Sequence, residues 1–316
     1  MDGMPKRLRW WTELPLVVVV YAAYSAGRLL ARGDEADAVG HGLGVLDLEK
    51  RLRIDFEQPL NRLFSGTPAL GVPADFVYAS LHYLVTPAIL VWLFRRRPAG
   101  YRTARTWLMV STLLGLVGFT LMPTCPPRLL AAGHGFTDTM AQFSSYGWWG
   151  GEASAPRGLG GMTNQFAAMP SLHVGWALWC GVMLWLHGRG PVAKVLAVAY
   201  PTVIALVVMG TANHYFLDAV AGGAVMGAGL LLTRPALRLA DRVRARSGRR
   251  AARFGERVRA RSGERVRARS GLRAGGRLGI TAPIVGGGCE TSAGEHIPGQ
   301  RTPSAGAGDS TPAATR

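Results

Sequence analysis

Hydrophobic residues gather along this chain into long stretches that polar residues interrupt mainly at their ends. Stretches of this length approach or exceed what an α-helix needs to cross a bilayer. They are residues 14–30, 74–94, 105–122, 170–187, 192–212 and 215–233. The pattern predicts an all-α fold, a polytopic membrane protein with six transmembrane helices in a bundle.

Lysine and arginine residues lie at alternate ends of the predicted spans. They precede the first span, separate the second from the third and the fourth from the fifth, and follow the last. Since positively charged loops stay in the cytoplasm, we expect a multi-pass protein of the cell membrane with cytoplasmic N- and C-termini. The connections 31–73, 123–169 and 213–214 then face the outside.

Most of the positive charge follows the last predicted span. Of the formal net charge of +17, residues 234–316 contribute +12, from 18 arginines against six acidic residues. A basic segment directly after a membrane helix attracts anionic lipid head groups, so we expect membrane-surface binding rather than nucleic-acid binding, with a plain solvated tail as the alternative. The chain then divides into an N-terminal helix and outer loop (1–73), a catalytic membrane domain (74–233) and a basic, low-complexity, disordered cytoplasmic tail (234–316).

Two histidines and an aspartate lie at the outward ends of the later spans. His173 is near the start of the fourth span, and His214 and Asp218 lie where the fifth span ends and the sixth begins. Ionisable groups are costly in lipid and usually mark a pathway or a reaction site. Because the spans alternate in direction, we expect these residues to meet in one extracytoplasmic pocket.

These residue types suit phosphate chemistry. His214 and Asp218 are four apart, so on a helix they share one face, and the carboxylate can orient the imidazole for nucleophilic attack. His173 can give a proton to the departing oxygen. Pro170 suits the first turn of a helix. Ser171 and His173 would then lie beside free backbone N–H groups, where a phosphate binds well.

Two other interpretations of this cluster remain open. Two imidazoles and a carboxylate also suit zinc, and a single membrane histidine often has only a structural role. The phosphate-ready helix end and the nearby Arg128 favour chemistry without a metal, so neither a metal nor another cofactor is expected. Cys125, Cys180 and Cys289 fall in different regions, without metal-ligand spacing or a disulfide framework.

Further polar residues lie near the same membrane face. Arg128 can clamp phosphate oxygens with its forked guanidinium, although an interfacial arginine can equally meet lipid head groups. Asn164, Gln165 and Tyr215 are candidates for binding a head group. His82 lies deeper, in the second predicted span, where a structural hydrogen bond is as reasonable as a role in the site.

The segment Met169–His173 (Met-Pro-Ser-Leu-His) and the pair His214-x3-Asp218 resemble motifs of the phosphatidic acid phosphatase type 2 superfamily. The segments 123–130 and 164–179 are most similar to the branch that contains inositol phosphorylceramide synthase and related bacterial membrane proteins. The resemblance spans roughly residues 74–233. It implies a phosphohistidine mechanism without a metal, in which His214 attacks phosphorus, Asp218 orients His214, and His173 protonates the leaving group.

The chain departs from the phosphatase branch of that superfamily. Leu172 stands where that branch has glycine, and Val207-Val208 stands where it has Ser-Arg. Its first motif, Lys-x6-Arg-Pro, is absent, and Pro-Pro-Arg128 stands near its place. These differences favour the synthase-like branch.

The sequence therefore predicts an integral membrane lipid phosphotransferase or phosphatase, of inositolphosphotransferase type, acting on a lipid-linked phosphate at the outer leaflet. Simple hydrolysis of a lipid phosphate monoester is the alternative. A non-catalytic membrane scaffold or lipid carrier is a third interpretation. The sequence does not identify the lipid, the acceptor or the oligomeric state.

Overall fold

The structure, a computed structural model, describes residues 34–149 and 164–274, together with Trp11, Glu13, Pro15, Val18 and Ala22. Throughout these residues the chain forms helices joined by turns and short 3-10 segments, and an isolated bridge pairs Thr124 with Ala167. The prediction of an all-α fold is therefore confirmed for the described part of the chain. The predicted first span, 14–30, lies outside it except for single positions.

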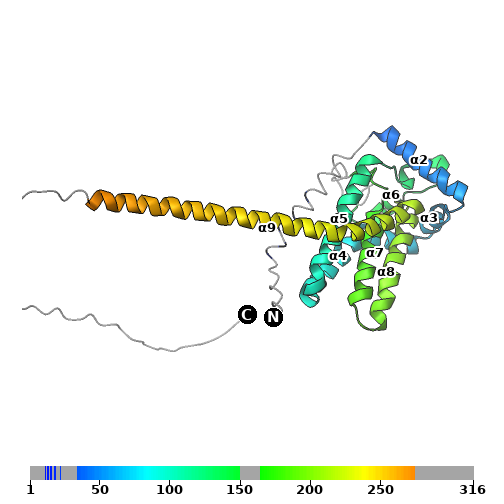
Figure 1. The fold of residues 1–316 in the computed structure, drawn as a ribbon. Helices are drawn as coiled ribbons and strands as arrows, with labels where there is room; N and C mark the ends of the chain where they lie inside the picture. Colours follow the sequence, from blue (N-terminus) through cyan, green and yellow to red (C-terminus); the bar gives the residue numbers. More distant parts are fainter. Residues whose placement is uncertain are drawn as a thin grey trace, which may run out of the picture. The chain divides into compact units, whose positions relative to one another are not determined.

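Four helices within the described residues are long and apolar enough to cross a membrane. They are α4 (Pro68–Arg96), α5 (Pro98–Leu121), α8 (Gly190–Gly210) and the part Phe216–Arg257 of α9. The predicted fourth span corresponds to α7 (Leu172–His187), which is apolar but has only 16 residues. Helices α4, α5, α7 and α8 lie side by side (Figure 1). A bundle of membrane-type helices is thus present, and six spans remain a prediction.

The described segment before α4 contains two helices, α2 (Glu35–Leu52) and α3 (Glu57–Gly66). The side chain of Asp34 accepts a hydrogen bond from the N–H of Ala36 and begins α2, and Arg53 ends it in the left-handed conformation, with φ 58°. The apolar face of α2 packs against Cys125, Leu130 and Tyr215. Helix α2 therefore lies against the segment that leads into α9.

The connection between α5 and α7 contains several short elements. They are η1 (Pro127–Leu129), η2 (Ala132–His134), α6 (Thr139–Gln142) and η3 (Ser144–Tyr146). Thr139 donates a hydrogen bond to the buried Asp75 of α4 at 2.7 Å. Asn61 of α3 donates to the carbonyl oxygens of Thr137 and Gly210, at 3.0 and 2.9 Å. Polar side chains thus anchor this connection to the helices beneath it.

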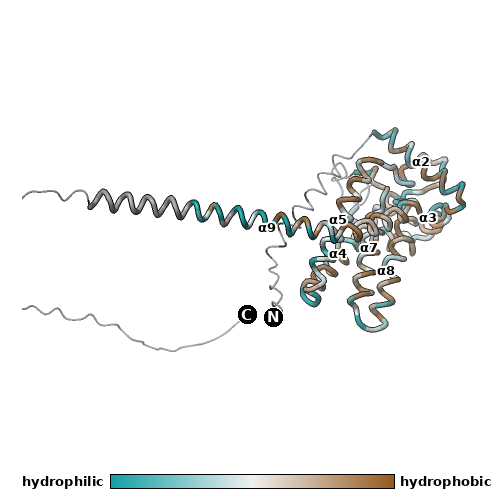
Figure 2. The backbone as a smooth tube through the Cα atoms, in the orientation of Figure 1, coloured by the Kyte–Doolittle hydropathy of each residue, from teal (hydrophilic) through white to brown (hydrophobic). Residues whose placement is uncertain are grey.

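Helix α9 runs from Phe216 to Ala274 and contains Pro235. Figure 2 shows its change from an apolar first part to a hydrophilic continuation. Up to Ala274 the basic tail is helical, where the sequence predicts disorder, because arginine and alanine are good helix formers. Contacts divide the chain into two units, 1–250 and 251–316, and the candidate site lies in the first.

Candidate active site

His214 and Asp218 form a hydrogen-bonded pair at the start of α9. The Nδ1 atom of His214 lies 3.3 Å from Oδ2 of Asp218, and this oxygen also accepts the N–H of Tyr215 at 2.9 Å. The side chain of Asp218 is fully buried and that of His214 is 4% exposed. A carboxylate on Nδ1 fixes the ring orientation and leaves Nε2 as the nitrogen for chemistry.

The ring of His173 lies next to that of His214. Their centroids are 5.7 Å apart and their planes are inclined by 59°. On its other sides His173 stacks on Tyr78 at 4.6 Å and meets His82 edge-on at 4.3 Å, both from α4. The two histidines expected from the sequence are therefore neighbours, close enough for one small group to contact both rings.

The main chains that carry these histidines are in direct contact. The N–H of Ser171 donates to the carbonyl oxygen of Asp218 at 2.9 Å. Gly222, one turn further along α9, allows this approach, because a Cβ atom there would lie 2.2 Å from the carbonyl oxygen of Ser171. The separation of His173 and His214 is thus set by backbone contact between α7 and α9.

The beginning of α7 differs from the expectation. Pro170 precedes the helix rather than opening it, and Ser171 is the N-cap, with Leu172 as the first helical residue. The hydroxyl of Ser171 accepts the N–H of Val174 at 3.4 Å. One backbone donor of the first turn is therefore already bound by the cap, while His173 does lie in that first turn.

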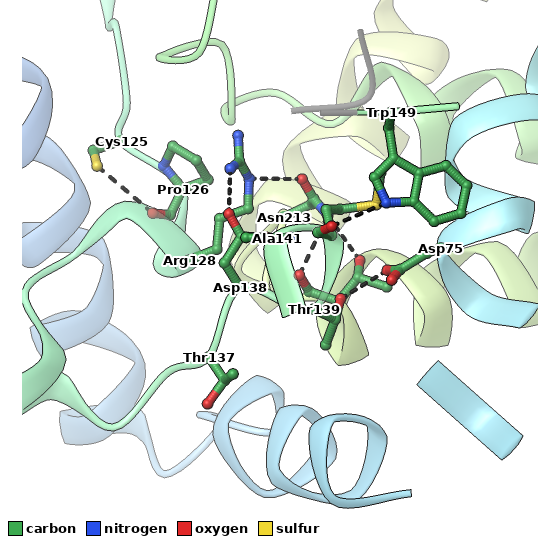
Figure 3. A network of polar contacts seen from close by, with 12 residues as sticks. Asp75, Cys125, Pro126, Arg128, Thr137, Asp138, Thr139, Ala141, Trp149 and Asn213 are labelled. Atoms are coloured by element: carbon green, nitrogen blue, oxygen red, sulfur yellow. Dashed lines mark hydrogen bonds and ion pairs between the residues drawn. The ribbon is translucent and has the colours of Figure 1, made fainter. Parts of the chain in front are cut away.

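Arg128 reaches the site from η1 through the residue that precedes His214. Its Nε donates to Oδ1 of Asn213 at 3.0 Å, and its backbone N–H donates to Ala212 at 2.9 Å. One terminal nitrogen also forms an ion pair with Asp138 at 2.8 Å, and the Arg128 side chain is only 2% exposed. Figure 3 shows the guanidinium between Asp138 and Asn213. Arg128 is thus a fixed, paired cation that binds the residue next to His214.

The other predicted head-group contacts lie in different places. Asn164, which is buried, and Gln165, which is partly exposed, lie in the loop before α7. The Asn164 side chain accepts the N–H of Phe166 at 2.9 Å. Tyr215 is fully buried and its hydroxyl donates to the carbonyl oxygen of Cys125 at 3.0 Å.

Sequence reasoning missed three acidic residues near the site. Asp138 pairs with Arg128, and the buried Glu49 and Glu57 of α2 and α3 lie beside the start of α9. Nothing in the local pattern distinguishes them from other acidic residues of the outer connections. In residues 34–149, 164–250 and 252–257 no group of three or more His, Cys, Asp or Glu side chains is arranged to hold a metal ion.

Comparison with known families decides the classification. Residues 43–232 match the family model of the PAP2 superfamily. The chain belongs to the PAP2 superfamily. It is therefore a membrane protein of phosphatase type, as its apolar helices also indicate. The match begins within α2, so it includes the end of α2 and all of α3, which the motif resemblance does not cover, and it ends before the basic tail. No characterised relative and no solved structure matches the chain.

Proposed function

We propose that this PAP2 superfamily protein is a lipid phosphotransferase of inositolphosphotransferase type, working through a phosphohistidine on His214. The observation that carries the proposal is the pair of adjacent imidazoles, His173 and His214, with the Nδ1 atom of His214 bound to the buried Asp218. A pair of histidines with only a structural role does not need a buried carboxylate bound to one of its rings. A nucleophilic histidine does need one, because the carboxylate fixes which ring nitrogen faces the substrate.

The reaction then has two balanced halves. In the first, the Nε2 lone pair of His214 attacks phosphorus, the bond from phosphorus to the leaving oxygen breaks, and protonated His173 gives that oxygen its proton. In the second, an alcohol or water attacks the phosphorus, His173 takes the proton of the attacking oxygen, and the N–P bond breaks. Both histidines return to their starting states, and Asp218 stabilises the positive charge on His214 throughout.

Position 208, where the phosphatase branch has an arginine, is a valine in this chain. This difference supports transfer rather than ordinary hydrolysis. Val208 is 1% exposed and packs in the core cluster with Ala74 and Tyr78. Its carbonyl oxygen accepts the N–H groups of Asn213 and His214, at 3.0 and 3.1 Å. The backbone there shapes the segment that carries the nucleophile, and Arg128 is left as the phosphate clamp. Simple hydrolysis of a lipid phosphate is the second candidate, favoured by membership of a phosphatase family.

The membrane setting belongs to the same proposal. Arginines and lysines at the ends of α4 and α8 and in the tail favour a cytoplasmic location for these parts. His173 and His214 lie at the opposite ends of their helices, so the reaction takes place at the outer leaflet on a membrane lipid. The basic helix after Arg234 binds anionic lipid head groups at the cytoplasmic surface.

The test uses the purified full-length chain in lipid nanodiscs with lipids labelled at phosphorus, with and without an alcohol acceptor. Transfer predicts a labelled phosphodiester or phosphomonoester of the acceptor, through an acid-labile and alkali-stable phosphoenzyme. If only free phosphate forms in every condition, the transfer candidate fails and the phosphatase candidate remains. A chain that forms neither product nor phosphoenzyme from a broad panel of lipid phosphates would contradict both candidates.

A further inference from the structure

A carboxyl group of α2 reaches the first turn of α9. Glu49 is fully buried, and its Oε1 accepts the backbone N–H of Leu217 at 2.6 Å. Leu217 lies between His214 and Asp218 in the sequence. Its N–H is one of the donors that have no partner within a helix at its N-terminus. A residue far away along the chain thus binds the turn that carries the histidine–aspartate pair.

Glu57 lies beside Glu49. It is the first residue of α3, is fully buried, and acts on Glu49 electrostatically. Two neighbouring buried carboxylates repel each other, and the repulsion is relieved when one of them keeps its proton. The two carboxyl groups therefore favour a state that holds at least one proton.

The electrostatic surroundings favour that protonated form. Burial and the neighbouring Glu57 raise the pKa of Glu49 to about 9. Burial also raises the pKa of Glu57. The other titratable groups around the pair are Asp55 between α2 and α3, Asp218 in α9, and Tyr215 before it. All can carry only negative charge, so they disfavour a second ionisation of the pair.

We propose that Glu49 is a positioning residue that fixes the first turn of α9 and so keeps His214 opposite His173. The role of His214 as nucleophile rests on the proposed function, whereas the bond to Leu217 does not. Other hydrogen bonds to this turn come from Ser171 at the start of α7 and from Asp218 within α9. Glu49 supplies the hydrogen bond from α2, and its loss would leave the turn without an attachment to α2.

Two substitutions of similar size separate this role from mere packing. Glu49→Gln keeps an oxygen for the N–H of Leu217 without a titrating group. Glu49→Met fills the same space and removes this bond. Asp47→Asn is the matched control, because Asp47 lies on the same helix, is 59% exposed and pairs with Arg51 at the surface. Each is compared with the full-length wild type in nanodiscs.

Amide hydrogen exchange followed by mass spectrometry reports the attachment without reference to activity. Glu49→Met is expected to raise exchange in the peptide covering residues 213–221, while Glu49→Gln and Asp47→Asn keep wild-type exchange. With a lipid phosphate substrate, Glu49→Met should lower kcat by about 10- to 100-fold with little change in KM, the cost of a misplaced nucleophile. Glu49→Gln should restore kcat at neutral pH.

Several results would overturn the proposal. Wild-type exchange and wild-type kcat in Glu49→Met would show that the bond positions nothing. If Glu49→Met fails to fold while Glu49→Gln folds normally, Glu49 is needed for folding and not for positioning. If the wild type has no activity on any lipid phosphate but exchange still rises only in Glu49→Met, the attachment stands and the proposed function fails.

Discussion

The backbone N–H of Ser171 donates to the carbonyl oxygen of Asp218 at 2.9 Å, so the segments that carry His173 and His214 are joined by their main chains. Side chains alone could drift with their rotamers, whereas a main-chain bond fixes both histidine-bearing turns to one another. The geometry of the imidazole pair therefore depends on how closely α7 and α9 approach.

Gly222→Ala tests this dependence. A Cβ atom there would lie 2.2 Å from the carbonyl oxygen of Ser171, so the helices must separate. We expect the free energy of unfolding to fall by about 1–3 kcal/mol. Phosphoenzyme formation should fall by a larger fraction of its wild-type value than the free energy of unfolding does. Gly227→Ala, on the same helix with nothing within 4 Å of the added atom, should leave phosphoenzyme formation unchanged and raise the free energy of unfolding by about 0.5–1 kcal/mol. Thermal unfolding and labelling measure the two effects, and equal behaviour of the two variants would refute the dependence.

His214→Ala decides between an enzyme and a non-catalytic scaffold. Loss of the nucleophile should lower turnover of a lipid phosphate by on the order of 10²-fold or more and abolish the labelled phosphoenzyme. His134→Ala is the control, because His134 lies in η2 and is partly exposed. Full activity in His214→Ala would end the catalytic assignment.

Arg128→Lys tests the phosphate clamp. Lysine keeps the charge but cannot bind Asn213 and Asp138 in the same forked geometry. Because a hydrogen bond to a charged group is worth about 1.5–3 kcal/mol, we expect KM to rise about 10-fold or more, with a smaller change in kcat. Arg62→Lys, on the exposed side of α3, should behave as wild type. Steady-state kinetics measure both, and an unchanged KM in Arg128→Lys would remove Arg128 from the site.

The histidine–aspartate pair and its second histidine could be predicted because the signal is local. The spacing of His214 and Asp218 and the positions of both histidines at span ends are visible in the sequence itself. Glu49 could not be predicted, since its partner Leu217 is 168 residues away and only the packing of α2 brings them together. The same holds for Asp138, which the fold of the outer connection places against Arg128. The helical course of α9 to Ala274 differs from the predicted disorder, because the alanines and arginines of this segment favour a helix.

The dependence of stability on pH follows from the raised pKa of Glu49. In the unfolded chain Glu49 loses its proton near 4.5, and in the folded protein near 9. Between these values the folded state binds more protons, so the free energy of unfolding falls as pH rises through this window. Glu49→Gln should fall less steeply. Thermal midpoints from pH 5 to 10 in nanodiscs measure the slopes, and parallel curves for wild type and Glu49→Gln would contradict the assignment.

The orientation in the membrane can be tested with single cysteines. Tyr146 in η3 is 63% exposed on the side of the proposed site, and Arg189, between α7 and α8, is exposed at the opposite end of the bundle. Cys125 and Cys180 are buried, so Cys289→Ser gives a suitable background. An impermeant maleimide should label Tyr146→Cys in intact cells and Arg189→Cys only after permeabilisation. Labelling in the reverse order would place the histidine pair at the inner leaflet, where the available lipid phosphates differ and the proposed substrates would have to change.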